Sequence, residues 1–265
     1  MRSLSSLLLT GGAGFIGSTL VRKLLERSEV ENLVILDKFT YAGDRKNLVG
    51  PDHDPRLTII DGDILDRALV TSLIKEHQFT GILNLAAESH VDRSIASNQE
   101  FALTNILGTS SLLEVSRSHK VPLLQCSTDE VYGPTPFPQK FDEFTKLRPS
   151  SPYSASKASA DLLTLAAHTT YLQDIVIARC TNNYGPRQHR EKLIPTLIYH
   201  AMRDEALPIY GSGQQIRDWI HVTDCALGLI AAFEHGHDQS LGCMEICRVP
   251  LKRQSEPFLR LLVFG

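Results

Sequence analysis

A glycine-rich loop lies between the first apolar run of the chain and its first helical pattern. Leu4–Leu9 is expected to form a strand, and Phe15–Arg27 has the periodicity of a helix. The loop between them is spaced as G-x-x-G-x-x-G by Gly11, Gly14 and Gly17. Glycine lets the backbone turn tightly and approach a ligand closely, and the following helix N-terminus offers N–H groups to a phosphate. This order of elements predicts a dinucleotide-binding unit.

Short apolar runs and helical patterns alternate over the first two thirds of the chain. Runs that are apolar throughout are typical of a parallel sheet with both faces covered by helices. The sequence therefore predicts an α/β fold of the Rossmann type, a doubly wound parallel sheet that binds ligands at the carboxyl ends of its strands. Further strands are expected at Leu33–Asp37, Leu57–Ile60, Gly81–Leu85, Val121–Cys126 and Ile175–Arg179, and further helices at Asp66–His77, Asn98–His119 and Ser151–Thr170.

The alternating pattern loosens from about residue 182. A helix at Leu193–Asp204, a strand at Trp219–Val222 and a helix at Cys225–His235 are expected there. We therefore divide the chain into three parts. Residues 1–181 are the dinucleotide-binding domain with the catalytic residues, residues 182–239 are a partial substrate-binding lobe, and residues 240–265 are a tail of atypical pattern.

Charge and composition argue against several classes of function. The net charge of −3 gives no electrostatic footprint for nucleic acid or an anionic membrane. No apolar stretch reaches the roughly 18–20 residues that span a bilayer. The five cysteines include no C-x-x-C pair, so neither a disulfide framework nor a metal site is expected. A reducing cytoplasm is the simplest prediction for the location.

Asp37 ends the second expected strand, 20 residues after Gly17. A carboxylate at this place accepts hydrogen bonds from ribose hydroxyls and repels a 2′-phosphate, which favours NAD over NADP. The alternative is that Asp37 only caps the end of its strand. Asp63 and Ile64 end the third strand region and are expected to border the adenine.

Tyr153 and Lys157 form a Y-x-x-x-K motif, which places both residues on one face of a helix. Ser151 and Pro152 are expected to be its N-cap and first residue. A lysine ammonium beside a phenol favours the phenolate, so that Tyr153 could act as a base near neutral pH. Thr128 follows an apolar strand, and its hydroxyl is expected to contact the same substrate oxygen.

Asp129 and Glu130 follow the same strand as an adjacent pair of carboxyl groups. Hydride transfer needs no such pair, whereas an elimination needs both an acid and a base. The pair therefore indicates oxidation coupled to loss of water. The alternative is an acidic pair in a solvated turn.

These motifs in this order resemble the extended short-chain dehydrogenase/reductase superfamily and, more narrowly, the dTDP-glucose 4,6-dehydratases. The resemblance covers residues 7–236, and related sugar epimerases usually carry small or hydroxyl residues in place of Asp129 and Glu130. The matching segments are TGGAGFIGS at 10–18, LDKFTYAG at 36–43, GDI at 62–64, NLAAESHVDRSI at 84–95, STDEVYG at 127–133, SPYSASKA at 151–158, NNYGPRQHREKLIP at 182–195 and PIYGSGQQIRDWIHVTD at 208–224.

The resemblance implies a lyase that converts dTDP-glucose to dTDP-4-keto-6-deoxyglucose and water, with NAD regenerated in every cycle. It implies that Tyr153 removes the proton of the hydroxyl at carbon 4, assisted by Lys157 and Thr128. It further implies that Glu130 removes the hydrogen at carbon 5 and that Asp129 protonates the hydroxyl leaving carbon 6.

The resemblance also implies the binding residues and a homodimer formed through the two long helices. The implied cofactor contacts are Gly11, Gly14, Phe15, Ile16, Gly17, Asp37, Lys38, Asp63, Ile64, Ala86, Tyr153 and Lys157. The implied substrate contacts are Ser89, His90, Thr128, Asn182, Lys192, Leu193, Pro208, Tyr210 and Arg217. No metal is implied.

Near Ser240 the resemblance stops, and we expect a chain that lacks the C-terminal part of the family. Two alternatives therefore stay open at this point. One is an epimerase or a dehydratase that acts on another nucleotide sugar. The other is a truncated remnant that binds NAD but has little activity.

Overall fold

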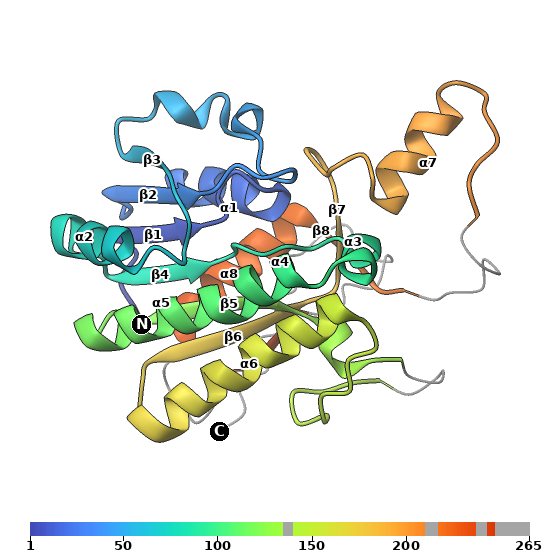
Figure 1. The fold of residues 1–265 in the computed structure, drawn as a ribbon. Coiled ribbons are helices and arrows are strands. Elements are labelled where there is room, and N and C mark those ends of the chain that lie inside the picture. Colours follow the sequence, from blue (N-terminus) through green and yellow to red (C-terminus); the bar gives the residue numbers. More distant parts are fainter. Residues whose placement is uncertain (135–139, 210–216, 237–242, 247–265) are drawn as a thin grey trace.

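Seven parallel strands form the main sheet of the computed structural model, which describes residues 1–134, 140–209, 217–236 and 243–246 (Figure 1). Their order across the sheet is β3-β2-β1-β4-β5-β6-β9. From β1 the chain winds outward in one direction to β3 and then in the other direction from β4, which confirms the predicted doubly wound sheet. The strands are β1 (Ser6–Thr10), β2 (Asn32–Asp37), β3 (Leu57–Asp61), β4 (Gly81–Asn84), β5 (Leu123–Thr128), β6 (Ile175–Cys180) and β9 (Cys243–Ile246).

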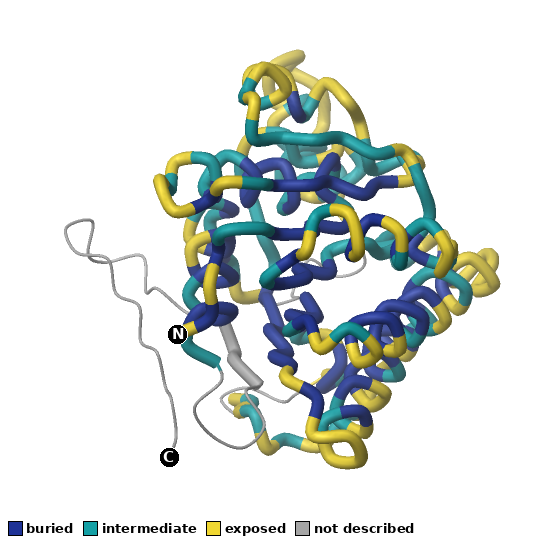
Figure 2. The backbone as a smooth tube through the Cα atoms, turned by 90° about the vertical axis from the view of Figure 1, so that its left-hand side faces the viewer, coloured by how far each residue is buried: buried dark blue, intermediate teal, exposed yellow. Residues whose placement is uncertain are grey.

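Helices cover both faces of this sheet. Helices α1 (Phe15–Leu25) and α8 (Val222–His235) pack on one face, and α2 (Arg67–His77), α5 (Thr109–His119) and α6 (Pro152–Tyr171) pack on the other (Figure 1). Leu7 and Leu9 of β1 lie in the cluster with α1 and α8, whereas Leu8 lies in the cluster with α2 and α5. Because alternate side chains point to opposite covered faces, the central strands are buried throughout (Figure 2).

The long helix expected over Asn98–His119 is divided into three segments. A short α4 (Gln99–Phe101) leads into η3 (Ala102–Gly108), whose hydrogen bonds are those of a π-helix, and α5 follows. The wider turn carries Asn105, whose side chain accepts from the Glu88 N–H at 2.9 Å and donates to the Ser156 hydroxyl at 2.8 Å. Asn105 thereby joins the loop after β4 to α6, and a π-helical turn beside a candidate site is a common arrangement.

Helix α6 begins as the sequence predicts. Ser151 is its N-cap and forms a reciprocal capping box with Ser154, and Pro152 is the first helical residue. This cap satisfies N–H groups that the first turn would otherwise leave without a partner. The start of the helix that carries Tyr153 and Lys157 is therefore well defined.

Two elements outside the predicted dinucleotide-binding domain also belong to the main sheet and its cover. Helix α8 falls in the predicted substrate lobe, and Cys225, Leu229 and Phe233 on it belong to the core cluster beside α1. Strand β9 lies in the tail, where no strand was predicted, and pairs in parallel with β6. The division into domains stays a prediction. The other described elements after β6 are the paired strands β7 (Asn182–Tyr184) and β8 (Trp219–His221) and the helix α7 (Leu193–Ala201).

Shorter elements follow the carboxyl ends of the strands. They are the 3-10 turns η1 (Arg45–Leu48) and η4 (Asp129–Tyr132) and the helix α3 (Val91–Ala96). A further 3-10 turn, η2 (Pro51–His53), leads into the amino end of β3. Within the described ranges, every helix is too short or too polar to cross a bilayer.

Phe233 provides a test of the packing between α8 and the sheet. Its ring is fully buried and lies against Gly81, where an added Cβ would approach the ring to 2.1 Å. Phe233→Ala should lower the free energy of unfolding by about 3–5 kcal/mol, because it leaves a cavity in a close-packed core. Urea unfolding followed by circular dichroism measures this. The control Phe144→Ala removes a ring that is 82% exposed and should change the value by less than about 0.5 kcal/mol. Equal values for the two variants would contradict the packing described here.

Candidate active site

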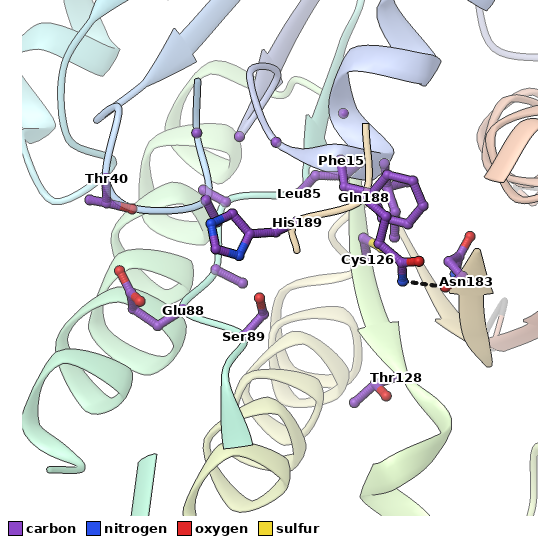
Figure 3. A pocket seen from close by; sticks show the side chains of 18 of the residues that line it. Phe15, Thr40, Leu85, Glu88, Ser89, Cys126, Thr128, Asn183, Gln188 and His189 are labelled. Carbon is purple, nitrogen blue, oxygen red and sulfur yellow. Dashed lines mark hydrogen bonds between the residues drawn. The ribbon is translucent and has the colours of Figure 1, made fainter. Parts of the chain in front are cut away.

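A cavity of about 700 Å³ lies at the carboxyl ends of the parallel strands (Figure 3). It is near the point where the winding of the sheet reverses, between β1 and β4, which is where doubly wound sheets bind ligands. Most of the candidate residues line it. They are Gly11, Gly14, Phe15, Ile16, Gly17, Asp37, Lys38, Asp63, Ile64, Ala86, Ser89, Thr128, Asp129, Glu130, Tyr153, Lys157, Asn182, Lys192 and Leu193.

Four predicted substrate contacts are not among the described residues that line the cavity. Tyr210 lies outside the described residues. His90 is the N-cap of α3, and its Nε2 lies 3.2 Å from Glu191 Oε2 rather than in the cavity wall. Pro208 and Arg217 are also not among the lining residues, although the charge of Arg217 lowers the pKa of Asp129 and Glu130.

The glycine loop lies so close to neighbouring backbone atoms that side chains would not fit at two of its positions. Gly11 has φ of +69°, and a Cβ there would lie 2.7 Å from the Ala86 nitrogen. A Cβ on Gly17 would lie 2.1 Å from the Gly11 oxygen, so neither position accepts a side chain without movement. Gly14 is the N-cap of α1 and has no side-chain capping bond. The first turn of α1 therefore presents its N–H groups and the positive end of the helix dipole to the cavity, a fit for a pyrophosphate.

Asp37 both caps the loop and faces the cavity. Its Oδ2 accepts from the Ala13 N–H at 2.8 Å, and its Oδ1 accepts from the Phe39 N–H at 2.9 Å. Burial raises the pKa of the Asp37 carboxyl, and these two hydrogen bonds oppose the rise. Because each carboxylate oxygen has two lone pairs, the carboxylate keeps acceptor capacity for a ribose hydroxyl. The two alternatives for Asp37 are thus compatible.

The cavity wall also contains two segments that carry no recognisable catalytic or binding motif. They are residues 40–44 after β2 and residues 187–191 after β7. The two segments meet where the Tyr41 and His189 rings make an edge contact, with centroids 5.9 Å apart. Figure 3 shows Thr40, Glu88 and His189 around the same space. Residues 40–43 and 187–191 lie within the sequence segments that carry the family resemblance, so the resemblance indicated them.

Tyr153 and Lys157 lie on the same face of α6 and are nearly buried. The Lys157 ammonium donates to the Cys126 carbonyl oxygen at 2.6 Å. Burial raises the pKa of the Tyr153 phenol well above its ordinary value, and the nearby Glu130 carboxylate acts in the same direction. The role of Tyr153 as a base assisted by Lys157 stays a prediction, and burial and the carboxylate charge oppose formation of the phenolate in the chain without cofactor.

Thr128, Asp129 and Glu130 form one hydrogen-bonded turn at the end of β5. The Thr128 hydroxyl oxygen accepts from the Glu130 N–H at 3.2 Å and lies 3.3 Å from Asp129 Oδ1. Burial raises the pKa of both carboxyl groups, and the charge of Asp129 raises that of Glu130 further. The Glu130 side chain is exposed and lines the cavity, so it is open to a ligand there. A pair of this kind keeps a proton more readily than two isolated carboxyls do, so it can offer both an acid and a base.

Comparisons with known proteins agree with this geometry. The profile of the family described as GDP-mannose 4,6 dehydratase matches residues 8–246. The low-salt glycan biosynthesis protein Agl12 of Haloferax volcanii is 47% identical over 230 residues, which cover 86% of this chain and 73% of that protein. The dTDP-glucose 4,6-dehydratase 1 of Escherichia coli K12 is 43% identical over 249 residues, which cover 87% of this chain and 69% of that enzyme.

A solved structure has the same arrangement of elements. The dTDP-glucose 4,6-dehydratase of Bacillus anthracis, crystallised in complex with NAD, superposes with a TM-score of 0.84 at 40% sequence identity. The match covers 91% of this chain and 75% of the other. At this identity the likeness extends to sequence as well as fold.

The raised pKa of Glu130 predicts a pH-dependent stability difference. Because the folded state holds this proton more tightly than the unfolded chain, an ionised Glu130 costs stability above its folded pKa, and the cost disappears as the pH falls through that value. Glu130→Gln should therefore raise the free energy of unfolding at about pH 8, and the gain should shrink toward about pH 4. Urea unfolding across this range measures it. The exposed Glu31 provides the control Glu31→Gln, and a gain for Glu130→Gln that did not change with pH would contradict the prediction.

Proposed function

The chain belongs to the GDP-mannose 4,6 dehydratase family, and on that basis we propose that it is an NAD-dependent hydro-lyase that converts dTDP-glucose to dTDP-4-keto-6-deoxyglucose and water. The observation that carries this proposal is the adjacency of two functional pairs in one cavity. Tyr153 and Lys157 suit an oxidation, and Asp129 and Glu130 suit an elimination.

The cavity residues fit a dinucleotide. The pyrophosphate binds at the N–H groups of the first turn of α1, the adenosine ribose binds at Asp37, and the adenine lies beside Asp63 and Ile64. Tyr153 and Lys157 hold the nicotinamide end. When bound, NAD supplies a hydride acceptor that returns the hydride later in the cycle, and its positively charged ring favours the tyrosine phenolate.

Tyr153 takes the proton from the hydroxyl at carbon 4 as the hydrogen on that carbon leaves as hydride. Thr128 hydrogen-bonds the same oxygen and orients it. Lys157, anchored on the Cys126 carbonyl, keeps a positive charge within the buried wall. The product of this step is a ketone at carbon 4, which makes the hydrogen on carbon 5 acidic.

The elimination then uses both carboxyl groups. Glu130 accepts the proton from carbon 5, and the electrons of that C–H bond form a double bond between carbons 5 and 6. Asp129 donates its proton to the hydroxyl on carbon 6, and the C–O bond breaks to release water. The raised pKa of Asp129 supports its role as the acid, since it retains its proton to a higher pH.

The remaining substrate contacts are proposed with the sugar near Ser89 and the nucleotide near Asn182, Lys192 and Leu193. The described elements β7, α7 and β8 form the substrate-binding part. Arg217 suits the diphosphate, because a guanidinium matches phosphate geometry.

We further propose a homodimer and a cytoplasmic location. The apolar side chains of Leu162, Leu163 and Tyr171 on α6 are exposed and could be covered by a second copy. The cytoplasmic location is proposed because the five cysteines include no C-x-x-C pair and no disulfide framework is expected from their number and spacing.

The assignment of Glu130 is tested with dTDP-glucose in a single turnover. Glu130→Gln should still oxidise carbon 4 but should slow the elimination by roughly 10²–10⁴, so that the absorbance of reduced cofactor accumulates. Exchange of solvent deuterium into carbon 5 should be lost. Tyr153→Phe should show no reduced cofactor, and Glu31→Gln should behave as the parent. Normal turnover and normal exchange in Glu130→Gln would refute the dehydratase assignment.

The choice of cofactor is tested at Asp37. Asp37→Asn keeps an acceptor for the loop but removes the charge that repels a 2′-phosphate. Its affinity for NAD should fall, and the preference for NAD over NADP should narrow by about tenfold or more, since each lost charge-assisted bond is worth about 1.5–3 kcal/mol. Calorimetric titration with each cofactor measures both. The control Asp66→Asn changes an exposed N-cap of α2, where Asn caps equally well. An unchanged preference in Asp37→Asn would remove Asp37 from this role.

A further inference from the structure

A buried polar cluster formed by Tyr132, Asp161 and Arg179 lies behind the wall of the cavity. All three residues are at most 2% exposed. The Arg179 Nε donates to Asp161 Oδ2 at 2.8 Å, and an Nη of the same guanidinium donates to the Tyr132 hydroxyl at 2.9 Å. The guanidinium carbon also lies 5.1 Å from the centroid of the Tyr132 ring. None of these residues has a role in the reaction proposed above.

Each member of the cluster belongs to a different element of the site. Arg179 lies on β6, immediately before Cys180 and Thr181, which line the cavity. Asp161 lies on α6, four residues after Lys157 and eight after Tyr153, and therefore on the same helix face. Tyr132 is the last residue of η4, the turn that begins with Asp129 and Glu130.

The cluster therefore connects the two functional pairs. The oxidation pair is carried by α6, the elimination pair by η4, and Arg179 binds one residue of each element. A planar guanidinium has several N–H donors in fixed directions, so it can hold both partners at once, which a lysine ammonium at the same place cannot do with equal geometry. Because Arg179 and Asp161 are buried as an ion pair, loss of either partner would leave a costly unpaired charge, which fixes the guanidinium in place.

We propose that Arg179 and Tyr132 are positioning residues. They hold Asp129 and Glu130 at the distance and orientation relative to Tyr153 that the reaction needs. The proposal rests on the proposed function. The hydrogen bond from Arg179 to the Tyr132 hydroxyl fixes η4 relative to β6 and α6. A displacement of about 1 Å at a reacting group can cost roughly a hundredfold in rate, so this contact is expected to matter for the elimination more than for the oxidation.

Tyr132→Phe isolates the hydroxyl. The ring keeps its stacking on Phe141, with centroids 5.0 Å apart, and its packing against Val131 and Ala158. In a single turnover with dTDP-glucose, the elimination should slow about tenfold to a hundredfold while oxidation of carbon 4 changes less than about threefold. Reduced cofactor should therefore accumulate transiently. The control Ser72→Ala removes the hydroxyl of an exposed serine on α2, which donates to the Leu69 carbonyl oxygen, and should behave as the parent.

A second variant tests whether Tyr132 acts through Arg179. Arg179→Lys keeps a positive charge for Asp161 but loses the planar guanidinium that donates to Asp161 and Tyr132 at once. It should therefore produce the same selective slowing of the elimination. Elimination in the double variant should be no slower than in the slower single variant, because both changes break the same hydrogen bond between Arg179 and Tyr132. Effects on the elimination rate that multiply in the double variant would show that the two residues act independently and would overturn the proposal.

The outcome is separable from that of the proposed function. If Glu130→Gln accumulates reduced cofactor but Tyr132→Phe slows both steps equally or neither, the positioning role is wrong and the dehydratase assignment stands. If Glu130→Gln does not accumulate reduced cofactor, the proposed function itself is wrong. Thermal unfolding of Tyr132→Phe should show a loss too small to unfold the protein at the assay temperature. Equal slowing of both steps together with a large loss of stability would show a merely structural role.

Discussion

The site depends on how closely the first turn of α1 approaches the ends of β1 and β4. A side chain at Gly17 would meet the Gly11 carbonyl, and one at Gly11 would meet the backbone of Ala86. Because these positions have no side chain, the N-terminus of α1 lies directly beside the point where the winding of the sheet reverses. The cavity opens there, and most of the candidate residues reach it from the carboxyl end of a strand or from the segment that follows.

The central strands and the helices beside them were predictable because their cause is local. The interiors of β1, β2 and β4 are apolar because both faces of the sheet are covered, and Ser151 with Pro152 begins α6 by a recognisable capping pattern. The placement of α8 and β9 on the sheet depends on contacts with distant segments, which a local pattern does not record. The π-helical turn at Asn105 likewise depends on partners elsewhere in the chain.

The candidate site was predictable in its residue types but not in its electrostatics. The glycine loop, Asp37, the Y-x-x-x-K motif and the carboxyl pair are visible as spacing and chemistry, and most of them line one cavity. The pKa of Tyr153 depends instead on burial and on the charges of residues more than 20 positions away, which the spacing to Lys157 does not record. The segments at 40–44 and 187–191 carry no chemical motif and become part of the wall only through folding.

The anchor of Lys157 is a backbone oxygen rather than a side chain. Every amino acid supplies that oxygen, so the identity of residue 126 is not what holds the ammonium in place. Position 126 can therefore accept other residues, provided that their side-chain volume and polarity suit the cavity wall. Exchange of Cys126 for another small apolar residue would therefore keep the anchor of Lys157, while Cys180 would still place a buried thiol in the cavity wall.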